Sequence, residues 1–262
     1  AWMSDMEKIK NAGFVPLSAG LKNGAWIAVT LGQYWTSQLA GDSQKAMEKF
    51  LTLDSAQAKF SQDKDFETAW KTLRTMYEKG YINKDCAILD FDSEAMPLFV
   101  QGKAAFRSDF SWNIGSAQEG LKDDFGMFII PDIKEGVTLT GSGIGGAAMS
   151  FHVTSSCKYP DEAVKFIKFI CSKNEQVAYM EERNGFIAAL NSIDPSYYKD
   201  PLVKQQAEWG AQNKSVLFLD SIIKQDLFQE IGKLEGLYIS GKISYEEFTR
   251  KLDEKAAQLN KK

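Results

Sequence analysis

Helical periodicity dominates this sequence of 262 residues, and only a few short apolar segments have the character of strands. Apolar residues recur every three to four positions over most of the chain, which is typical of amphipathic helices. The clearest stripe comprises Phe66, Ala69, Trp70, Leu73, Met76 and Tyr77. The predicted strands are residues 14–17, 104–108, 125–130 and 147–153. The pattern predicts a helix-rich α/β fold with fewer strands than two complete sheets would need.

Start and stop signals place the other helices. Gly13 ends a first helix, and a weaker one ends near Gly120. Further helices are expected at residues 25–39, 43–50, 93–100, 160–170, 174–182, 202–212, 223–240 and 245–260. Asn23 is the predicted cap of the helix at 25–39, and the Ser244-x-x-Glu247 pattern predicts a capping box for the last helix.

The segment Phe99–Trp112 combines a helix end, a glycine stop, a short strand and a polar tip. Gly102 ends the helix, and the tip presents Asp109 and Trp112 close together. A carboxylate beside a large flat ring suits a polar ligand with an apolar face, which is the chemistry of a sugar. The alternative is structural, with a buried Trp112 and with Asp109 as a helix cap.

Composition argues against several function classes. The net charge is −4, and only four arginines occur, without a basic patch, so nucleic acid is not an expected partner. One histidine and three cysteines without a Cys-x-x-Cys motif give little support for a catalytic triad, a metal site or a bound cofactor. No apolar run approaches the roughly 18 residues that span a bilayer.

The glycine-rich segment 141–146 matches the Gly-x-Gly-x-x-Gly pattern of dinucleotide sites. Such a site needs a helix directly after the glycines, and here strand-like residues follow. The glycines are better explained as backbone that approaches a ligand or absorbs a hinge rotation.

Several segments in a fixed order resemble the extracellular solute-binding proteins of family 1, the maltose-binding-like receptors of ABC importers. They are Met6–Leu17, Phe99–Phe106 with Trp112, Phe125–Pro131, residues 141–146, Tyr159–Ile170 and Tyr238–Phe248. The resemblance covers nearly the whole chain. It departs from the family pattern at Phe110, where the family usually has a glycine two residues before the tryptophan.

The resemblance implies a periplasmic-binding-protein-like (type II) architecture of two lobes with ligand between them. Residues 1–138 and 198–262 would form the C-terminal lobe, and residues 141–197 a remnant of the N-terminal lobe. Hinge crossings would lie near 139–146 and 195–200. The first part of the N-terminal lobe would be missing, which accounts for the shortage of strands. A truncated chain would bind ligand weakly or not at all, and its exposed apolar surface would favour self-association.

The resemblance and the local patterns together give the candidate ligand-binding residues. They are Trp26, Asp109, Trp112, Ser142, Gly143, Phe218 and Asp220. The two tryptophans would stack on sugar rings, and the two aspartates would accept hydroxyl hydrogen bonds. Asp220 has an equally plausible role as a helix cap, and Asp92, before Ser93 and Glu94, is predicted to be a cap as well.

The expected function is that of a non-catalytic receptor, which binds a sugar or oligosaccharide and delivers it to the membrane subunits of an ABC permease. Its expected location is extracellular, as a cell-surface lipoprotein or a periplasmic protein. Two alternatives stay open. A glycoside hydrolase would use acids such as Asp109 and Asp220. The same receptor fold could also take another ligand, such as a polyamine, a metal chelate or a peptide.

Overall fold

The computed structural model describes residues 2–121, 125–133, 144–145, 150–182, 185–190, 192–211 and 216–261. Helices account for most of this part. They are α1 (Trp2–Asn11), α2 (Gln33–Ala40), α3 (Ser43–Asp54), α4 (Lys64–Glu78), α5 (Met96–Val100), α6 (Ile114–Gly120), α7 (Pro160–Ile170), α8 (Lys173–Glu182), α9 (Pro201–Ala211), α10 (Gln225–Ile239) and α11 (Tyr245–Leu259). The predicted helices are therefore confirmed, with α3 four residues longer than expected.

Two short parallel sheets hold the strands. In the first, β1 (Val15–Ser18) pairs with β2 (Ala104–Arg107), and Leu17 lies opposite Phe106. In the second, β3 (Ile144–Gly145) pairs with β4 (Val216–Leu217). The predicted strands at 14–17 and 104–108 are confirmed.

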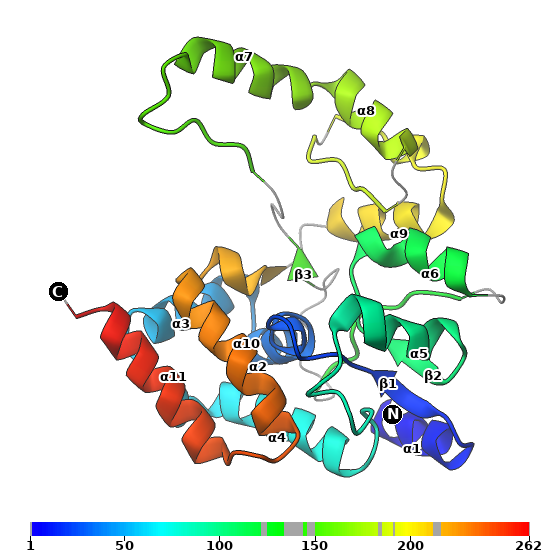
Figure 1. The fold of residues 1–262 in the computed structure, drawn as a ribbon, viewed down its shortest axis with the longest axis vertical. Helices are drawn as coiled ribbons and strands as arrows, with labels where there is room; N and C mark the ends of the chain where they lie inside the picture. The colour runs from blue at the N-terminus through cyan, green and yellow to red at the C-terminus, as the bar shows by residue number, and fades with distance from the viewer. Residues whose placement is uncertain are drawn as a thin grey trace.

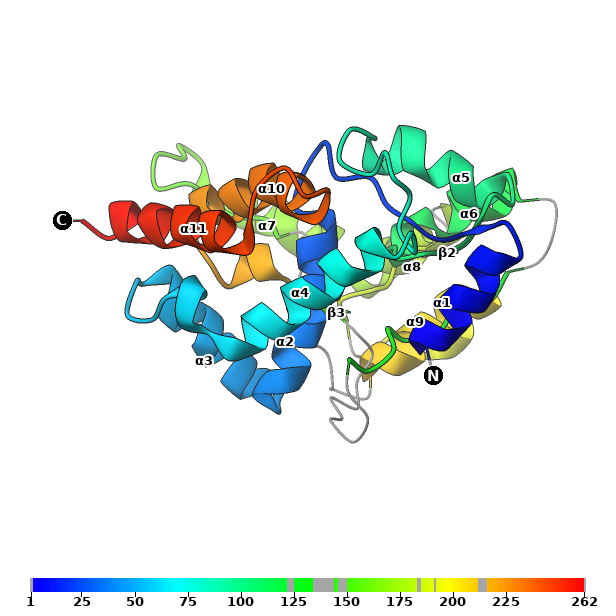
Figure 2. The same ribbon diagram turned by 90° about the horizontal axis from the view of Figure 1, so that it is seen from below.

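The main core lies among helices whose apolar faces meet on one side of β1 (Figure 1). The stripe of α4 is buried as the periodicity predicts, and Trp70 packs against Phe248 of α11 with ring centroids 4.8 Å apart. In a second view, α10 and α11 form a layer over α2, α3 and α4 (Figure 2). Burial of large rings such as Trp70 and Phe248 is the main source of stability in this layer.

Caps fix several of these helix starts. Asp42 accepts a hydrogen bond from the Lys45 amide at 2.8 Å, and Ser244 accepts one from Glu247 at 3.1 Å, as the capping box predicts. The prediction for Asp92 is wrong. Asp90 caps the π-helical turn Phe91–Ala95 that leads into α5, because its carboxylate accepts the amides of both Asp92 and Ser93.

The predicted cap of the helix at 25–39 is also wrong. This helix begins at Trp26 and runs through a π-helical segment, Ala28–Gly32, into α2. The Asn23 side chain donates a hydrogen bond to Asp90 instead, so it does not cap the helix. The acceptor at the helix start is Glu235 of α10, which takes a hydrogen bond from the Ala28 amide at 2.8 Å.

Two predicted strands are not strands in the described residues. Residues 125–130 were expected as a buried strand, but they form no ladder, and Phe128 is 53% exposed. The side chains of Ile129 and Ile130 pack on the core, and the Pro131 carbonyl accepts a hydrogen bond from Trp35 at 2.9 Å. Of the segment 147–153, residues 150–153 have no strand structure and residues 147–149 lie outside the described part. In both segments the described residues offer no neighbouring strand for pairing.

Helices α7 and α8 lie apart from this core, on the far side of β3 (Figure 1). The predicted amphipathic face of α7 is present in sequence but not buried, and Phe166 and Phe169 are 60% and 58% exposed. Nothing in the described part of the chain covers this face.

Candidate functional site

The candidate site lies where β1 and β2 both end. The two strands are parallel, so their carboxyl ends meet at one edge, where Ser18 lies opposite Arg107. After β1 the chain continues into Gly20, whose backbone approaches Asp90 so closely that a Cβ would lie 2.6 Å from the Asp90 carbonyl oxygen. After β2 it continues into Ser108 and Asp109. The carboxyl ends of parallel strands are the usual place for ligands in open α/β sheets.

Asp109 organises the turn after β2. One carboxylate oxygen accepts the Phe110 amide and the Asn113 side-chain amide, both at 2.8 Å, and the other accepts Arg107 Nε. Burial raises the pKa of the Asp109 carboxyl, although the Arg107 charge and these hydrogen bonds act in the opposite direction. The carboxylate is therefore already engaged within the protein, and its oxygens hold the turn that carries Trp112.

Arg107 links this turn to the capped π-helical segment. Its side chain is 2% exposed, and its guanidinium carbon lies 3.9 Å from the centre of the Phe91 ring. Its Nη2 atom is 3.6 Å from Asp92, and Asp92 also accepts a hydrogen bond from Asn113 at 3.0 Å. Two carboxylates thus balance the one arginine, and the polar part of the site carries no excess positive charge.

Five rings form a continuous aromatic cluster beside these polar groups. They are Trp26, Phe91, Phe110, Trp112 and Phe218. Trp26 stacks on Phe91 with centroids 4.6 Å apart, and Trp112 stacks on Phe110 at 4.4 Å with an interplanar angle of 9°. Phe110 links Trp112 to the other rings. Its ring centroid lies 5.9 Å from that of Trp26 and 5.8 Å from that of Phe218.

Exposure differs sharply along the aromatic cluster. Phe91 is 5% exposed, Trp26, Phe110 and Phe218 are half-buried, and Trp112 is 47% exposed. A large ring that is stacked on one face and open to solvent elsewhere is a platform for the apolar face of a ligand. The exposed end of the aromatic cluster is therefore Trp112.

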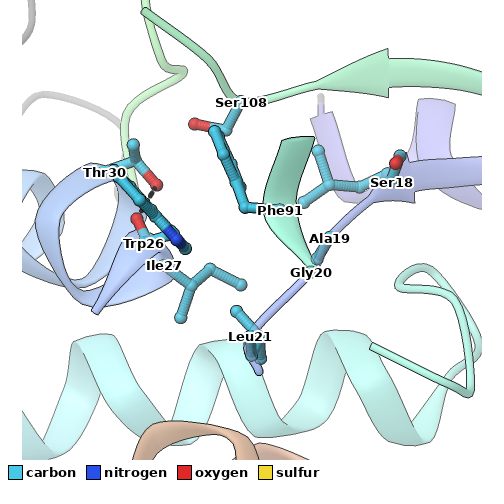
Figure 3. A pocket seen from close by; sticks show the side chains of 10 residues that line it. Ser18, Ala19, Gly20, Leu21, Trp26, Ile27, Thr30, Phe91 and Ser108 are labelled. Atoms are coloured by element: carbon cyan, nitrogen blue, oxygen red, sulfur yellow. Dashed lines mark hydrogen bonds between the residues drawn. The ribbon is translucent and has the colours of Figure 1, made fainter. Parts of the chain in front are cut away.

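A small cavity adjoins the buried end of the aromatic cluster (Figure 3). Ser18, Gly20, Trp26, Phe91 and Ser108 are among its lining residues. Its volume of about 10 Å³ is close to the least that one water molecule requires. This cavity is too small for a ligand larger than a water molecule, so the exposed surface around Trp112 is the candidate for ligand contact.

The structure brings three of the predicted site residues, Trp26, Trp112 and Phe218, into the aromatic cluster, with Asp109 directly beside it. Asp220 is exposed in the turn Leu219–Ser221, two residues after Phe218. Ser142 and Gly143 lie outside the described residues. The structure contains no ligand, so the binding roles of all seven stay predictions.

Sequence reasoning missed Phe91, Phe110 and Arg107 as parts of the site. Phe110 carried a signal, because it replaces the glycine of the family pattern. Arg107 carried one as well, since a charged residue at the end of an apolar strand two positions before an aspartate favours an ion pair. Phe91 gave no signal, because its neighbour Trp26 is 65 positions away in the sequence.

In the described ranges, no group of three or more His, Cys, Asp or Glu side chains is placed to hold a metal ion. A glycosidase needs two carboxyls across one bond, one of them with a raised pKa. The pKa of Asp109 is raised, but both of its carboxylate oxygens accept hydrogen bonds within the protein, and the exposed Asp220 accepts one from the Ser221 hydroxyl at 3.5 Å.

The sequence matches the family described as "Bacterial extracellular solute-binding protein" over residues 4–206. The chain belongs to this family. No curated protein matches the sequence. The family is extracellular by its description, and within the described residues no helix is long and apolar enough to cross a membrane.

Three of the solved structures of similar fold are sugar-related proteins by their descriptions. One is a chitin oligosaccharide binding protein, with a TM-score of 0.77 and 21% identity over 99% of this chain and 64% of that one. Another is a sugar transporter from Bacillus licheniformis in complex with stachyose, with a TM-score of 0.73 and 19% identity over 98% and 65% of the two chains. A third is the solute-binding protein RafE in complex with raffinose, with a TM-score of 0.68 and 16% identity over 99% and 64%.

These likenesses confirm the predicted fold class, the two-lobe architecture of extracellular solute-binding proteins. The chain spans slightly less than two thirds of the length of the structures that it matches, as the coverage of 64% shows. The prediction of a family 1-type solute-binding chain is therefore confirmed, while ligand and partners are matters of proposal.

Proposed function

We propose that this chain is part of a sugar-binding receptor of an ABC importer, with no catalytic role of its own. The observation that carries the proposal is the aromatic cluster, which ends in the half-exposed ring of Trp112 stacked at 4.4 Å on Phe110. Sugars present C–H faces that stack on such rings, and hydroxyls that exchange hydrogen bonds with the groups around them. The solved structures of similar fold support the same ligand class.

The polar groups beside the cluster favour a neutral ligand. Asp92, with a 63% exposed side chain, can accept hydrogen bonds from hydroxyl groups at the rim of the site. The Arg107 charge is balanced by Asp92 and Asp109, so a strongly anionic ligand gains little there. Asp220, exposed next to Phe218, is a further acceptor. A neutral mono- or oligosaccharide fits this surface better than a phosphate or a carboxylate.

The lobe assignment is part of the proposal. Residues 1–138 and 198–262 form one lobe and residues 141–197 belong to the other, with crossings near 139–146 and 195–200. The separate position of α7 and α8 in Figure 1 supports it. Ligand is held between the lobes, Ser142 and Gly143 present polar groups to the cleft, and the loaded receptor docks on the permease outside the cell. Attachment is as a lipoprotein or by confinement in the periplasm.

A thermal-shift panel tests the ligand class. The complete protein is heated with neutral sugars from mono- to tetrasaccharides, and in parallel with a polyamine, a peptide and a metal chelate. Ligand at 100 times its Kd stabilises the folded state by about 2.7 kcal/mol, which raises Tm measurably. A rise with a sugar alone supports the proposal. A rise only with one of the other ligands contradicts it, and sustained release of reducing sugar identifies a hydrolase instead.

A further inference from the structure

Glu235 is a carboxyl group in the middle of the core. It lies on α10 and is 0% exposed, in a region where the surrounding side chains are apolar. Its Oε2 atom accepts the Ala28 amide at 2.8 Å, and its Oε1 atom has no hydrogen-bond partner among the described residues. Burial of a carboxyl with one unsatisfied oxygen lowers the stability of the folded protein, so Glu235 is expected to have a compensating structural role.

Glu235 is placed to cap the start of another helix. Ala28 belongs to the first turn of the helix that begins at Trp26, and the sequence offers no side chain of that turn as a cap. The free amides of a helix start need acceptors and carry a partial positive charge. Glu235 reaches across from another helix to provide the acceptor, 207 positions away in the sequence.

Glycines bring the two helices close enough for this contact. A Cβ on Gly232 would lie 3.0 Å from the Ala25 nitrogen, and one on Gly236 would lie 3.4 Å from the Leu21 side chain and from Ala87. Gly232, three positions before Glu235, thus lets the backbone of α10 pack against the residues that lead into the turn, and Gly236, one position after it, packs against Leu21 and Ala87. The helix start is thereby fixed by packing and by one buried carboxyl.

The surroundings of Glu235 contain no compensating cation. In the described part of the chain no Lys or Arg forms an ion pair with it. The buried Cys86 thiol, from the segment after α4, is a titratable group close enough to interact with the Glu235 charge. Burial raises the pKa of Glu235 well above its ordinary value of 4.5, although the hydrogen bond from the Ala28 amide acts in the opposite direction.

We propose that Glu235 is a positioning residue for Trp26: its protonation state sets how firmly the first helical turn, and with it the Trp26–Phe91 stack, is held. When ionised, the carboxylate accepts the Ala28 amide through a charge-assisted hydrogen bond, and on protonation this bond weakens. Trp26 is the residue of the aromatic cluster that this turn carries (Figure 3). The inference rests on the proposed function only in treating the aromatic cluster as the ligand surface.

The sign of the effect on folding follows from the raised pKa. The folded protein binds the Glu235 proton more tightly than the unfolded chain does. The stabilising contribution is therefore complete below pH 4.5, the ordinary value, and is lost as the pH rises through the folded-state pKa. The variant Glu235→Gln cannot ionise, so this position should not lower the stability of the variant as the pH rises.

The test follows Trp26 by fluorine NMR of the complete protein labelled with 5-fluorotryptophan, with the resonance assigned from Trp26→Phe. The Trp26 resonance is expected to shift with pH, with a midpoint above 4.5, and to lose this titration in Glu235→Gln. Asp54→Asn is the matched control, because the Asp54 carboxylate is also buried and also accepts a backbone amide at 2.8 Å, at the start of α10. The control is expected to keep the Trp26 titration.

A Trp26 resonance that does not titrate in the unsubstituted protein would overturn the inference, whether or not Glu235→Gln folds. So would a titration that persists unchanged in Glu235→Gln. The measurement needs no ligand, so it is independent of the sugar panel. Absence of sugar binding with the Trp26 titration intact would refute the proposed function and support the positioning role.

Discussion

At the scale of single residues, Phe110 decides how the site is built. Its ring connects the Trp26–Phe91 pair with Trp112 and Phe218. Trp112 has its stacking partner only because this ring is present. Phe110 is thus the centre of the aromatic cluster, and its ring supports one face of the exposed tryptophan.

Replacing Phe110 by glycine should therefore loosen Trp112 and destabilise the protein. A fully buried Phe→Ala change costs about 3–5 kcal/mol, and Phe110 is half-buried, so we expect about 2 kcal/mol. Urea unfolding measures this loss. The control is Phe128→Gly, at a ring that is 53% exposed and touches only Phe106 among the described aromatic pairs. Equal losses in the two variants would contradict the central role of Phe110.

At the scale of elements, the sequence predicted those helices and strands that depend on residues close together in the chain. The stripe of α4, the capping box of α11 and the two strands that meet at the site were all predictable, because each depends on neighbours in the sequence. The start of the helix at Trp26 was not, since its cap is Glu235, more than 200 positions away. The segment 125–130 has strand composition but no partner strand in the described part, which a single sequence does not reveal.

The π-helical turn Phe91–Ala95 is an element whose cap has a testable pH dependence. Backbone and side-chain hydrogen bonds from Ser93 lower the pKa of Asp90 from 3.8 to about 2. The stabilising contribution of Asp90 is then complete above pH 3.8 and is lost as the pH falls to about 2. The Tm difference between the unsubstituted protein and Asp90→Ala should shrink over this interval. A difference that stays constant there would rule out the charged cap.

At the scale of the whole molecule, the arrangement leaves the apolar face of α7 uncovered. Phe166 and Phe169 project from a helix with acidic residues in its first turn and Lys168 in its last. Two copies of α7 packed antiparallel would bury these rings and place each acidic turn beside the other copy's lysine. We therefore expect the 262-residue chain to self-associate through α7.

Light scattering after size-exclusion chromatography tests this expectation over a range of concentrations. The variant Phe166→Glu should shift the chain toward monomer. Ile88→Glu should not, although it places the same charge at a side chain that is just as exposed, 61% against 60%. A chain that is monomeric at every concentration, or one that both variants affect alike, would contradict association through α7.

The central claim is that the exposed ring of Trp112 is a sugar-binding platform at the ends of β1 and β2. Isothermal titration of the complete protein with the sugar that stabilises it most tests this claim directly, with Trp112→Ala beside the unsubstituted protein. A stacked ring contributes about 0.5–1.5 kcal/mol beyond its buried area, so we expect the affinity to fall by about twofold to tenfold or more. An affinity that is unchanged in Trp112→Ala would contradict the account.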